Sequence, residues 1–128
     1  MFDTGKAFSG FSVDDLSAAR AFYRDVLGLA VTEDDMGFLT LHLDSGATIL
    51  IYGKPDHVPA GYTILNFGVP DIDSAVDELV SRGITMEVYD GMAHDEKGIM
   101  RGGGPDIAWF TDPAGNVLSV IAPGDSTG

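Results

Sequence analysis

The sequence lacks cysteine and is poor in basic residues, and both shortages exclude classes of function. Without cysteine, its 128 residues form no disulfide, no thiolate-ligated zinc site or iron–sulfur cluster, and no thiol nucleophile. Seven Lys and Arg residues stand against twenty Asp and Glu residues, for a formal net charge of −13. Nucleic acids and anionic membranes bind positive patches, so we expect neither as a partner. The acidic balance favours cationic ligands or serves solubility alone.

The sequence also lacks a long apolar run. No apolar segment reaches the roughly 18 to 20 residues that span a bilayer. Residues 1–6 lack the basic and then apolar pattern of a signal peptide. We therefore expect a soluble, cytoplasmic protein. The hydrophobic share of 45% is typical of a globular chain, and the length predicts one domain around one core.

A strand followed by an amphipathic helix is predicted twice along the chain. Each helix begins after an aspartate and ends at a glycine, the residues that favour helix starts and ends. The two units carry matching motifs, Phe11-x-Val13-x-Asp15-Leu16 and Phe67-x-Val69-x-Asp71-Ile72. About three strands follow each helix, and a tight turn joins the last two. The sequence thus predicts an α+β fold of two βαβββ repeats, about residues 7–55 and 61–123, whose curved mixed sheets surround a cavity.

Alternation along the predicted strands sorts their residues into two faces. One face is large and apolar, and we expect the helices to cover it: Phe11, Val13, Leu39, Leu41, Ile49, Ile51, Leu65, Phe67, Val69, Ala108, Phe110, Leu118 and Val120. The other face mixes aromatic, aliphatic and hydrogen-bonding side chains. Such a face is typical of a small-molecule pocket, although a polar surface or a dimer contact explains it equally well.

Two segments resemble motifs of a known superfamily. Residues 18–29, Ala-Ala-Arg-Ala-Phe-Tyr-Arg-Asp-Val-Leu-Gly-Leu, are similar to the first helix of the glyoxalase, bleomycin resistance protein and extradiol dioxygenase superfamily, also called the vicinal oxygen chelate superfamily. Residues 110–117, Phe-Thr-Asp-Pro-Ala-Gly-Asn-Val, resemble its Asp-Pro-x-Gly-Asn turn. The likeness covers about residues 7–123 and implies the paired βαβββ fold. Function stays open, because the superfamily includes lyases, isomerases, epimerases, dioxygenases, thiol transferases and binding proteins without catalysis.

The resemblance also places four metal-ligand positions, which His, Gln or Glu occupy in metal-dependent relatives. On this chain they are Phe8, Leu50, Ile64 and Ser119. None of these is a competent ligand for a catalytic divalent ion, and the adjacent residues include no His, Asp or Glu. We therefore expect neither a metal nor another cofactor. His42, the only histidine on a predicted strand, is a candidate general base or a polar pocket residue.

The candidate ligand contacts come from the mixed face and from the glycine-rich loop over residues 90–105. They are Phe38, His42, Leu50, Tyr52, Ile64, Asn66, Trp109 and Ser119 on strands, and Met92, His94, Met100 and Arg101 in the loop. The loop lacks the lysine and the following helix of a phosphate-binding loop. It either covers the cavity mouth, as the resemblance allows, or is an ordinary hairpin loop.

Trp109 offers a flat ring to an aromatic or cationic ligand, or lies in a core or interface. His57 is expected in an exposed loop.

These observations leave three functions open. The first is a metal-free binding protein, resembling the bleomycin resistance branch, that sequesters an aromatic or cationic drug or metabolite and so supports antibiotic resistance. The second is a lyase, isomerase or dioxygenase-like enzyme with an atypical or metal-independent site. In the third, the groove serves subunit contact alone. Because relatives commonly pair, the resemblance also implies a homodimer, which native mass spectrometry would contradict by finding only single chains.

Overall fold

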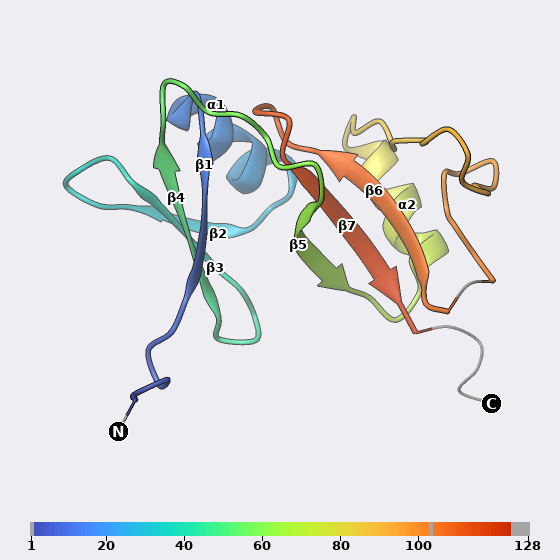
Figure 1. Ribbon diagram of the computed structural model, residues 1–128, viewed down its shortest axis with the longest axis horizontal. Helices are drawn as coiled ribbons and strands as arrows, with labels where there is room; N and C mark the ends of the chain where they lie inside the picture. The colour runs from blue at the N-terminus through green and yellow to red at the C-terminus, as the bar shows by residue number, and fades with distance from the viewer. Residues whose placement is uncertain (1, 103, 124–128) are drawn as a thin grey trace. The chain divides into compact units, whose positions relative to one another are not determined.

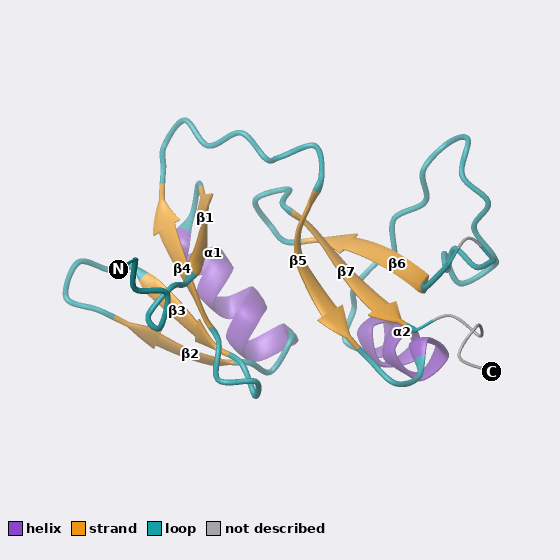
Figure 2. Ribbon diagram, turned by 60° about the horizontal axis from the view of Figure 1, so that its bottom comes forward, coloured by secondary structure: helices purple, strands orange, loops and turns teal. Residues whose placement is uncertain are grey.

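The computed structural model describes residues 2–102 and 104–123, which form two compact units, Met1–Val58 and Pro59–Gly128 (Figure 1). Each unit has its own sheet, and a helical segment lies against one face of that sheet (Figure 2). The boundary falls in the segment expected to link the two repeats. The predicted α+β class is confirmed. In the described residues no helix has the length and apolar character needed to cross a membrane.

The first unit contains a four-stranded sheet. Its strands are β1 (Ser9–Val13), β2 (Ala30–Glu33), β3 (Leu39–His42) and β4 (Thr48–Gly53), in the order β1-β4-β3-β2. β1 runs parallel to β4, while β2 and β3 continue the sheet in antiparallel pairs. The helix α1 (Leu16–Arg20) and a π-helical stretch (Ala21–Val26) connect β1 to β2. This order of elements is the predicted βαβββ repeat.

The first helical segment starts as predicted but ends differently. Asp15 caps it, because its carboxylate accepts a hydrogen bond from the Ala18 N–H at 3.1 Å. Beyond Arg20 the helix widens, and the Leu27 N–H donates to the Phe22 carbonyl, five residues earlier, at 2.9 Å. Hydrophobic spacing of three and four residues does not distinguish this wider turn from an ordinary helix. The stretch buries Tyr23 completely in the core of the first unit.

The second unit has a three-stranded sheet. It contains β5 (Thr63–Gly68), α2 (Ile72–Ser81), β6 (Asp106–Thr111) and β7 (Val117–Ala122), with the strand order β5-β7-β6. In place of the first of the three strands expected after α2, single residues bridge to β6: Glu87 to Trp109, and Met100 to Ile107. The intervening residues 88–99 leave the sheet edge and are called the 88–99 loop below.

Strand register shows that the two sheets are built alike. On the parallel side, Gly10 pairs with Leu50 in the first unit, and Asn66 pairs with Ser119 in the second. On the antiparallel side, Thr40 pairs with that same Leu50, and Trp109 pairs with that same Ser119. Trp109 therefore takes the place in the second unit that Thr40 takes in the first.

The predicted helix-side face forms most of the core. Its buried members are Phe11, Val13, Leu39, Leu41, Ile49, Ile51, Leu65, Ala108, Phe110, Leu118 and Val120. Phe67 and Val69 are only half-buried. Val69 lines an open groove of about 340 Å³ along α2, which leaves the end of this face accessible.

The turn between β6 and β7 depends on Asp112. Its buried carboxylate accepts hydrogen bonds from the Ala114 N–H at 3.0 Å, the Asn116 N–H at 2.9 Å and the Asn116 side-chain amide at 3.0 Å. A carboxylate that accepts three hydrogen bonds replaces the water it loses on burial. Asp112 is therefore a structural residue of the turn.

Asp112→Ala should destabilise the protein strongly, because it leaves buried N–H groups without their acceptor. We expect the free energy of unfolding, measured by urea denaturation, to fall by about 2 to 4 kcal/mol. Asp44→Ala is the matched control, since Asp44 is exposed in the corresponding turn of the first unit. Its effect should stay within about 0.5 kcal/mol. Equal losses in the two variants would contradict the role assigned to Asp112.

Candidate functional site

The four positions that the resemblance assigns to metal ligands differ in their surroundings. Phe8 precedes β1 and is 64% exposed, while Leu50 is half-buried on β4. Ile64 lies where the register of β5 against β7 shifts, and Ser119 is fully buried. The cross-strand neighbour of Ser119 is Asn66 rather than Ile64. Across the described ranges 2–102 and 104–123, no group of three or more His, Asp or Glu side chains is placed to hold a metal ion.

A row of four side chains crosses the second sheet on the face opposite α2. The pairings Glu87–Trp109, Trp109–Ser119 and Ser119–Asn66 join these residues directly across the sheet edge, β6, β7 and β5. Directly paired residues present their side chains on the same face, with Cβ atoms about 5 Å apart. The row therefore places a carboxylate, an indole ring, a hydroxyl and an amide side by side. Glu87, Trp109, Ser119 and Asn66 are called the second-sheet row below.

Ser119 orients the amide of Asn66. The Ser119 hydroxyl is completely buried and donates a hydrogen bond to Asn66 Oδ1 at 2.5 Å. A buried hydroxyl requires such a partner. Since Asn66 is exposed, its Nδ2 group is the part that remains available to a ligand. This end of the row offers a hydrogen-bond donor.

Trp109 is held in place by three neighbours. Its indole Nε1 donates to Thr63 Oγ1 at 3.1 Å. The rings of Tyr89 and His94 meet the indole edge to face, with centroids 5.6 Å and 5.8 Å away. We call Tyr89, His94 and Trp109 the aromatic cluster. Because the indole N–H is already bonded and the side chain is only half-buried, Trp109 offers a ligand ring surface rather than a donor.

His94 closes the 88–99 loop against Trp109. Its Nε2 accepts a hydrogen bond from the Tyr89 N–H at 3.1 Å, and its Nδ1 donates to the Gly98 carbonyl at 2.9 Å. The two bonds together require the neutral imidazole with its proton on Nδ1. Both ring nitrogens are thus bonded to the loop backbone. His94, expected from the sequence as a ligand contact, orders the loop and does not offer a free nitrogen to a ligand.

Glu87 and Tyr89 set the charge beside the cluster. Burial, and then the nearby Glu87 carboxylate, raise the pKa of the Tyr89 hydroxyl above its ordinary value. Tyr89 therefore remains a neutral phenol at physiological pH. Glu87 contributes a negative charge on the same face as Trp109, next to it across the sheet edge.

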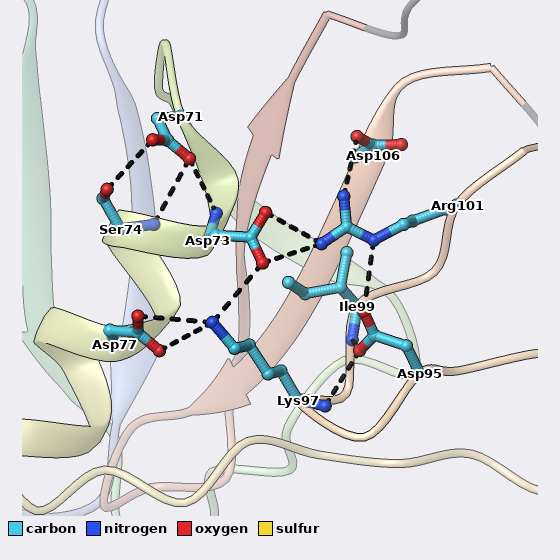
Figure 3. A network of polar contacts seen from close by, with 9 residues as sticks. All are labelled: Asp71, Asp73, Ser74, Asp77, Asp95, Lys97, Ile99, Arg101 and Asp106. Carbon is cyan, nitrogen blue, oxygen red and sulfur yellow. Dashed lines mark hydrogen bonds and ion pairs between the residues drawn. The ribbon is translucent and has the colours of Figure 1, made fainter.

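Arg101 ties the loop to α2 rather than contributing to the second-sheet row (Figure 3). Both Asp73 carboxylate oxygens accept hydrogen bonds from its Nη2 at 2.9 Å. Its other nitrogens pair with Asp95 at 3.1 Å and with Asp106 at 3.4 Å. Lys97 adds an ion pair to Asp73 at 3.4 Å. The hydrogen bonds from Arg101 hold the pKa of the Asp73 carboxyl below its ordinary value.

The remaining predicted contacts are distributed over both units. Phe38, His42, Leu50 and Tyr52 belong to the first unit. His42 is exposed at the end of β3, where its Nε2 lies 2.8 Å from Thr32 Oγ1. In the second unit, Met92 is 40% exposed on the 88–99 loop. Met100 is half-buried and bridges to the edge of β6.

Three residues near these positions were not predicted as contacts. By simple alternation, Thr63 should point to the same face of β5 as Leu65, toward the helix. The register shift between Thr63 and Leu65 instead brings the Thr63 hydroxyl to Trp109. Tyr89 lies in a stretch without periodicity. His57, expected in an exposed loop, is half-buried, with its Nδ1 2.6 Å from Ser12 Oγ. An alternation pattern cannot reveal contacts created by a bulge or by a loop that folds back.

A groove on the helix side of the second unit is a less suitable ligand site. It measures about 490 Å³ between α2 and residues 84–98, and its lining includes Val76, Val80, Asp77 and Lys97. Two of its three charged lining residues already pair with each other, because Lys97 Nζ lies 3.1 Å from an Asp77 carboxylate oxygen; Glu96 is the third. None of the described residues that line this groove is aromatic. We therefore place the candidate site on the second-sheet row.

Fold and site together define a paired-repeat α+β protein whose second sheet presents an aromatic and polar row. The family model of the Glyoxalase/Bleomycin resistance protein/Dioxygenase superfamily matches residues 8–120. The chain belongs to this superfamily, as its motifs predicted. A comparison with curated protein sequences finds no match.

Solved structures share the fold at low sequence identity. TnmS3, an antibiotic binding protein from Streptomyces sp. CB03234, is 21% identical with a TM-score of 0.68, over 95% of this chain and 99% of that one. The fosfomycin resistance protein FosX from Listeria monocytogenes is 14% identical with a TM-score of 0.71, over 98% and 95%. A glyoxalase/bleomycin resistance protein/dioxygenase from Alicyclobacillus acidocaldarius is 19% identical with a TM-score of 0.69, over 99% and 98%.

Acid should release the 88–99 loop from α2. Because the folded pKa of Asp73 is depressed, its ion pairs stabilise the fold above the ordinary pKa and lose this effect as pH falls through the folded pKa. For an aspartate this occurs below about pH 4. Hydrogen exchange of residues 94–101, corrected for intrinsic rates, should accelerate there.

In Arg101→Met, the amides of these residues should exchange faster than in the wild type already at neutral pH. The further acceleration in acid should be smaller than in the wild type, because only the ion pairs of Lys97 remain to be lost. The matched control is Arg82→Met, since Arg82 forms an ion pair with Glu78 four residues earlier on α2. If the amides of residues 94–101 are equally protected from hydrogen exchange in the wild type and in Arg101→Met, the ion pairs of Arg101 do not hold the loop.

His94→Phe should loosen the loop, because it keeps an aromatic ring beside Trp109 but removes both backbone hydrogen bonds. We expect a loss of about 1 to 2 kcal/mol in the free energy of unfolding and a red shift of the tryptophan emission. Trp109 is the only tryptophan, so the spectrum reports this site alone. His42→Phe, at an exposed position of the first unit, should leave the emission unchanged. An unshifted spectrum in His94→Phe would refute the ordering role.

Proposed function

We propose that the protein binds a small aromatic cation, without a metal, on the second-sheet row. The observation that carries this proposal is the placement of Trp109, which is fixed by Thr63, Tyr89 and His94 and yet only half-buried. A ring that is already immobilised loses little entropy when a flat ligand stacks on it. An immobilised and accessible indole is therefore suited to binding.

The neighbours of Trp109 define the ligand class. Glu87 lies beside it on the same face and favours a positive charge, and cation–π attraction to the indole acts in the same direction. On the other side, the Asn66 amide offers a donor to a carbonyl or ether oxygen. The overall charge of −13 attracts cations over a longer range. An aromatic cation with one acceptor atom matches these three features.

Binding is favoured over turnover by the state of the polar groups on this face. Both nitrogens of His94 are bonded to backbone, and the Ser119 hydroxyl is bonded to Asn66. These groups therefore lack the freedom that proton transfer to a substrate requires. The antibiotic binding protein and the fosfomycin resistance protein that share the fold support a role in sequestering a drug or metabolite.

N-Methylquinolinium and uncharged methylquinoline form a matched pair of probes for this proposal. The cation should raise the melting temperature and quench Trp109, with an affinity about tenfold above that of the neutral ring. Trp109→Leu should abolish the thermal shift. Glu87→Gln should weaken the preference for the cation, because it deletes the neighbouring negative charge while keeping the shape of the side chain.

Tyr62→Leu is the control, since Tyr62 is an aromatic residue that is 72% exposed and lies outside the row. It should bind the cation like the wild type. A thermal shift that survives in Trp109→Leu, or a failure of both probes to stabilise the wild type, would overturn the proposal.

A further inference from the structure

A hydroxyl and an imidazole lie in hydrogen-bond contact in the first unit, outside the second-sheet row. Ser12 Oγ on β1 lies 2.6 Å from His57 Nδ1, and both side chains are half-buried. A serine within this distance of an imidazole has the geometry of an activated nucleophile, because the ring can take the hydroxyl proton during attack. We propose that Ser12 is a nucleophile activated by His57, and that it accepts the acyl group of small activated esters.

A rigid turn holds His57 in place. The Lys54 N–H donates to the Val13 carbonyl at 2.8 Å, which fastens the end of β4 to β1. The His57 N–H then donates to the Lys54 carbonyl at 2.9 Å and closes a four-residue turn. Pro55 occupies the second position of this turn, where its fixed φ is favourable. The imidazole is therefore positioned over β1 before any substrate arrives.

Ser12 is equally constrained. The residues on either side of it, Phe11 and Val13, are core residues that are only 9% and 1% exposed. The pairing of Ser12 with Tyr52 fixes the position of Ser12 along β1 relative to β4. Since its two neighbours point into the core, the Ser12 side chain points to the face opposite the helix. The strand cannot turn this hydroxyl away from His57 without removing Phe11 and Val13 from the core.

A second hydroxyl–imidazole pair in the same unit lacks these constraints and provides an internal comparison. Thr32 Oγ1 lies 2.8 Å from His42 Nε2, but both residues are exposed. Water competes for an exposed pair, and the secondary hydroxyl of threonine is more hindered than the primary hydroxyl of serine. We therefore expect activation at Ser12 and not at Thr32.

The proposed step conserves atoms and electrons without a cofactor. Ser12 Oγ attacks the carbonyl carbon of the ester, and its proton passes to His57 Nδ1. The bond between the carbonyl carbon and the leaving oxygen then breaks. That oxygen takes the proton from His57, which leaves an acyl ester on Ser12 and a free alcohol or phenol.

p-Nitrophenyl acetate is the probe for this step. Intact mass and peptide mapping should find one acetyl group per chain, on Ser12, with release of one p-nitrophenol. His57→Gln should slow acetylation of Ser12 about 100-fold, the contribution expected of a general base. His42→Gln should leave it unchanged. Acetylation confined to amines, or acetylation of Ser12 at the same rate in His57→Gln, would overturn the proposal.

The absence of native cysteine permits a second, independent measurement. Ser12→Cys introduces a single thiol beside His57, where the imidazole promotes the thiolate form. Iodoacetamide should alkylate it at least about tenfold faster at neutral pH than it alkylates Thr32→Cys or the double variant Ser12→Cys/His57→Gln. Equal rates in the three proteins would also overturn the proposal.

This inference does not rest on the proposed binding function. Acetylation of Ser12 that depends on His57, in a protein that N-methylquinolinium neither stabilises nor quenches, would overturn the binding proposal and support this one. N-Methylquinolinium binding without acetylation of Ser12 would do the reverse.

Discussion

The hydrogen bond between Ser119 and Asn66 is the interaction on which the candidate binding face depends. β7 is the central strand of the second sheet, and Leu118, Ser119 and Val120 are all buried on it. A hydroxyl buried on such a strand must find a partner, or it would cost free energy comparable to a lost hydrogen bond. The partner is the directly opposite residue, Asn66. The bond therefore satisfies the strand and orients the amide that the face presents.

The sheet edge beside Trp109 is covered by a loop and not by a continuous strand. A continuous fourth strand, like β2 in the first unit, would cover the edge of β6 with backbone. Among the described residues of the second unit, Glu87 and Met100 alone bridge to that edge, and the 88–99 loop between them is closed by His94. The chain has seven basic residues, and two of them, Lys97 and Arg101, pair this loop with α2. Exposed ion pairs are individually weak, so His94 and the buried Ile99 complete the attachment of the loop.

Several contacts illustrate how far sequence reasoning reached. It predicted the helix caps at Asp15 and Asp71, because a cap involves residues only two or three positions apart. It assigned Trp109 and Asn66 to one face, because alternation has a period of two. It failed for Thr63, where a register shift breaks that period, and for His57, which reaches Ser12 across 45 positions of sequence. It also listed Arg101 with the ligand contacts, although three carboxylates on other parts of the second unit engage its guanidinium.

The sequence by itself determined the paired repeat, the buried face of each sheet and the superfamily, because these follow from local hydrophobic periodicity, capping residues and turn motifs. Only the tertiary structure decided which side chains meet: Asn66 with Ser119, Glu87 with Trp109, and Ser12 with His57. Such pairs depend on strand register and on where loops fold back. Those are set by the packing of the whole unit, since shifting a strand by one residue would move its apolar side chains out of the core.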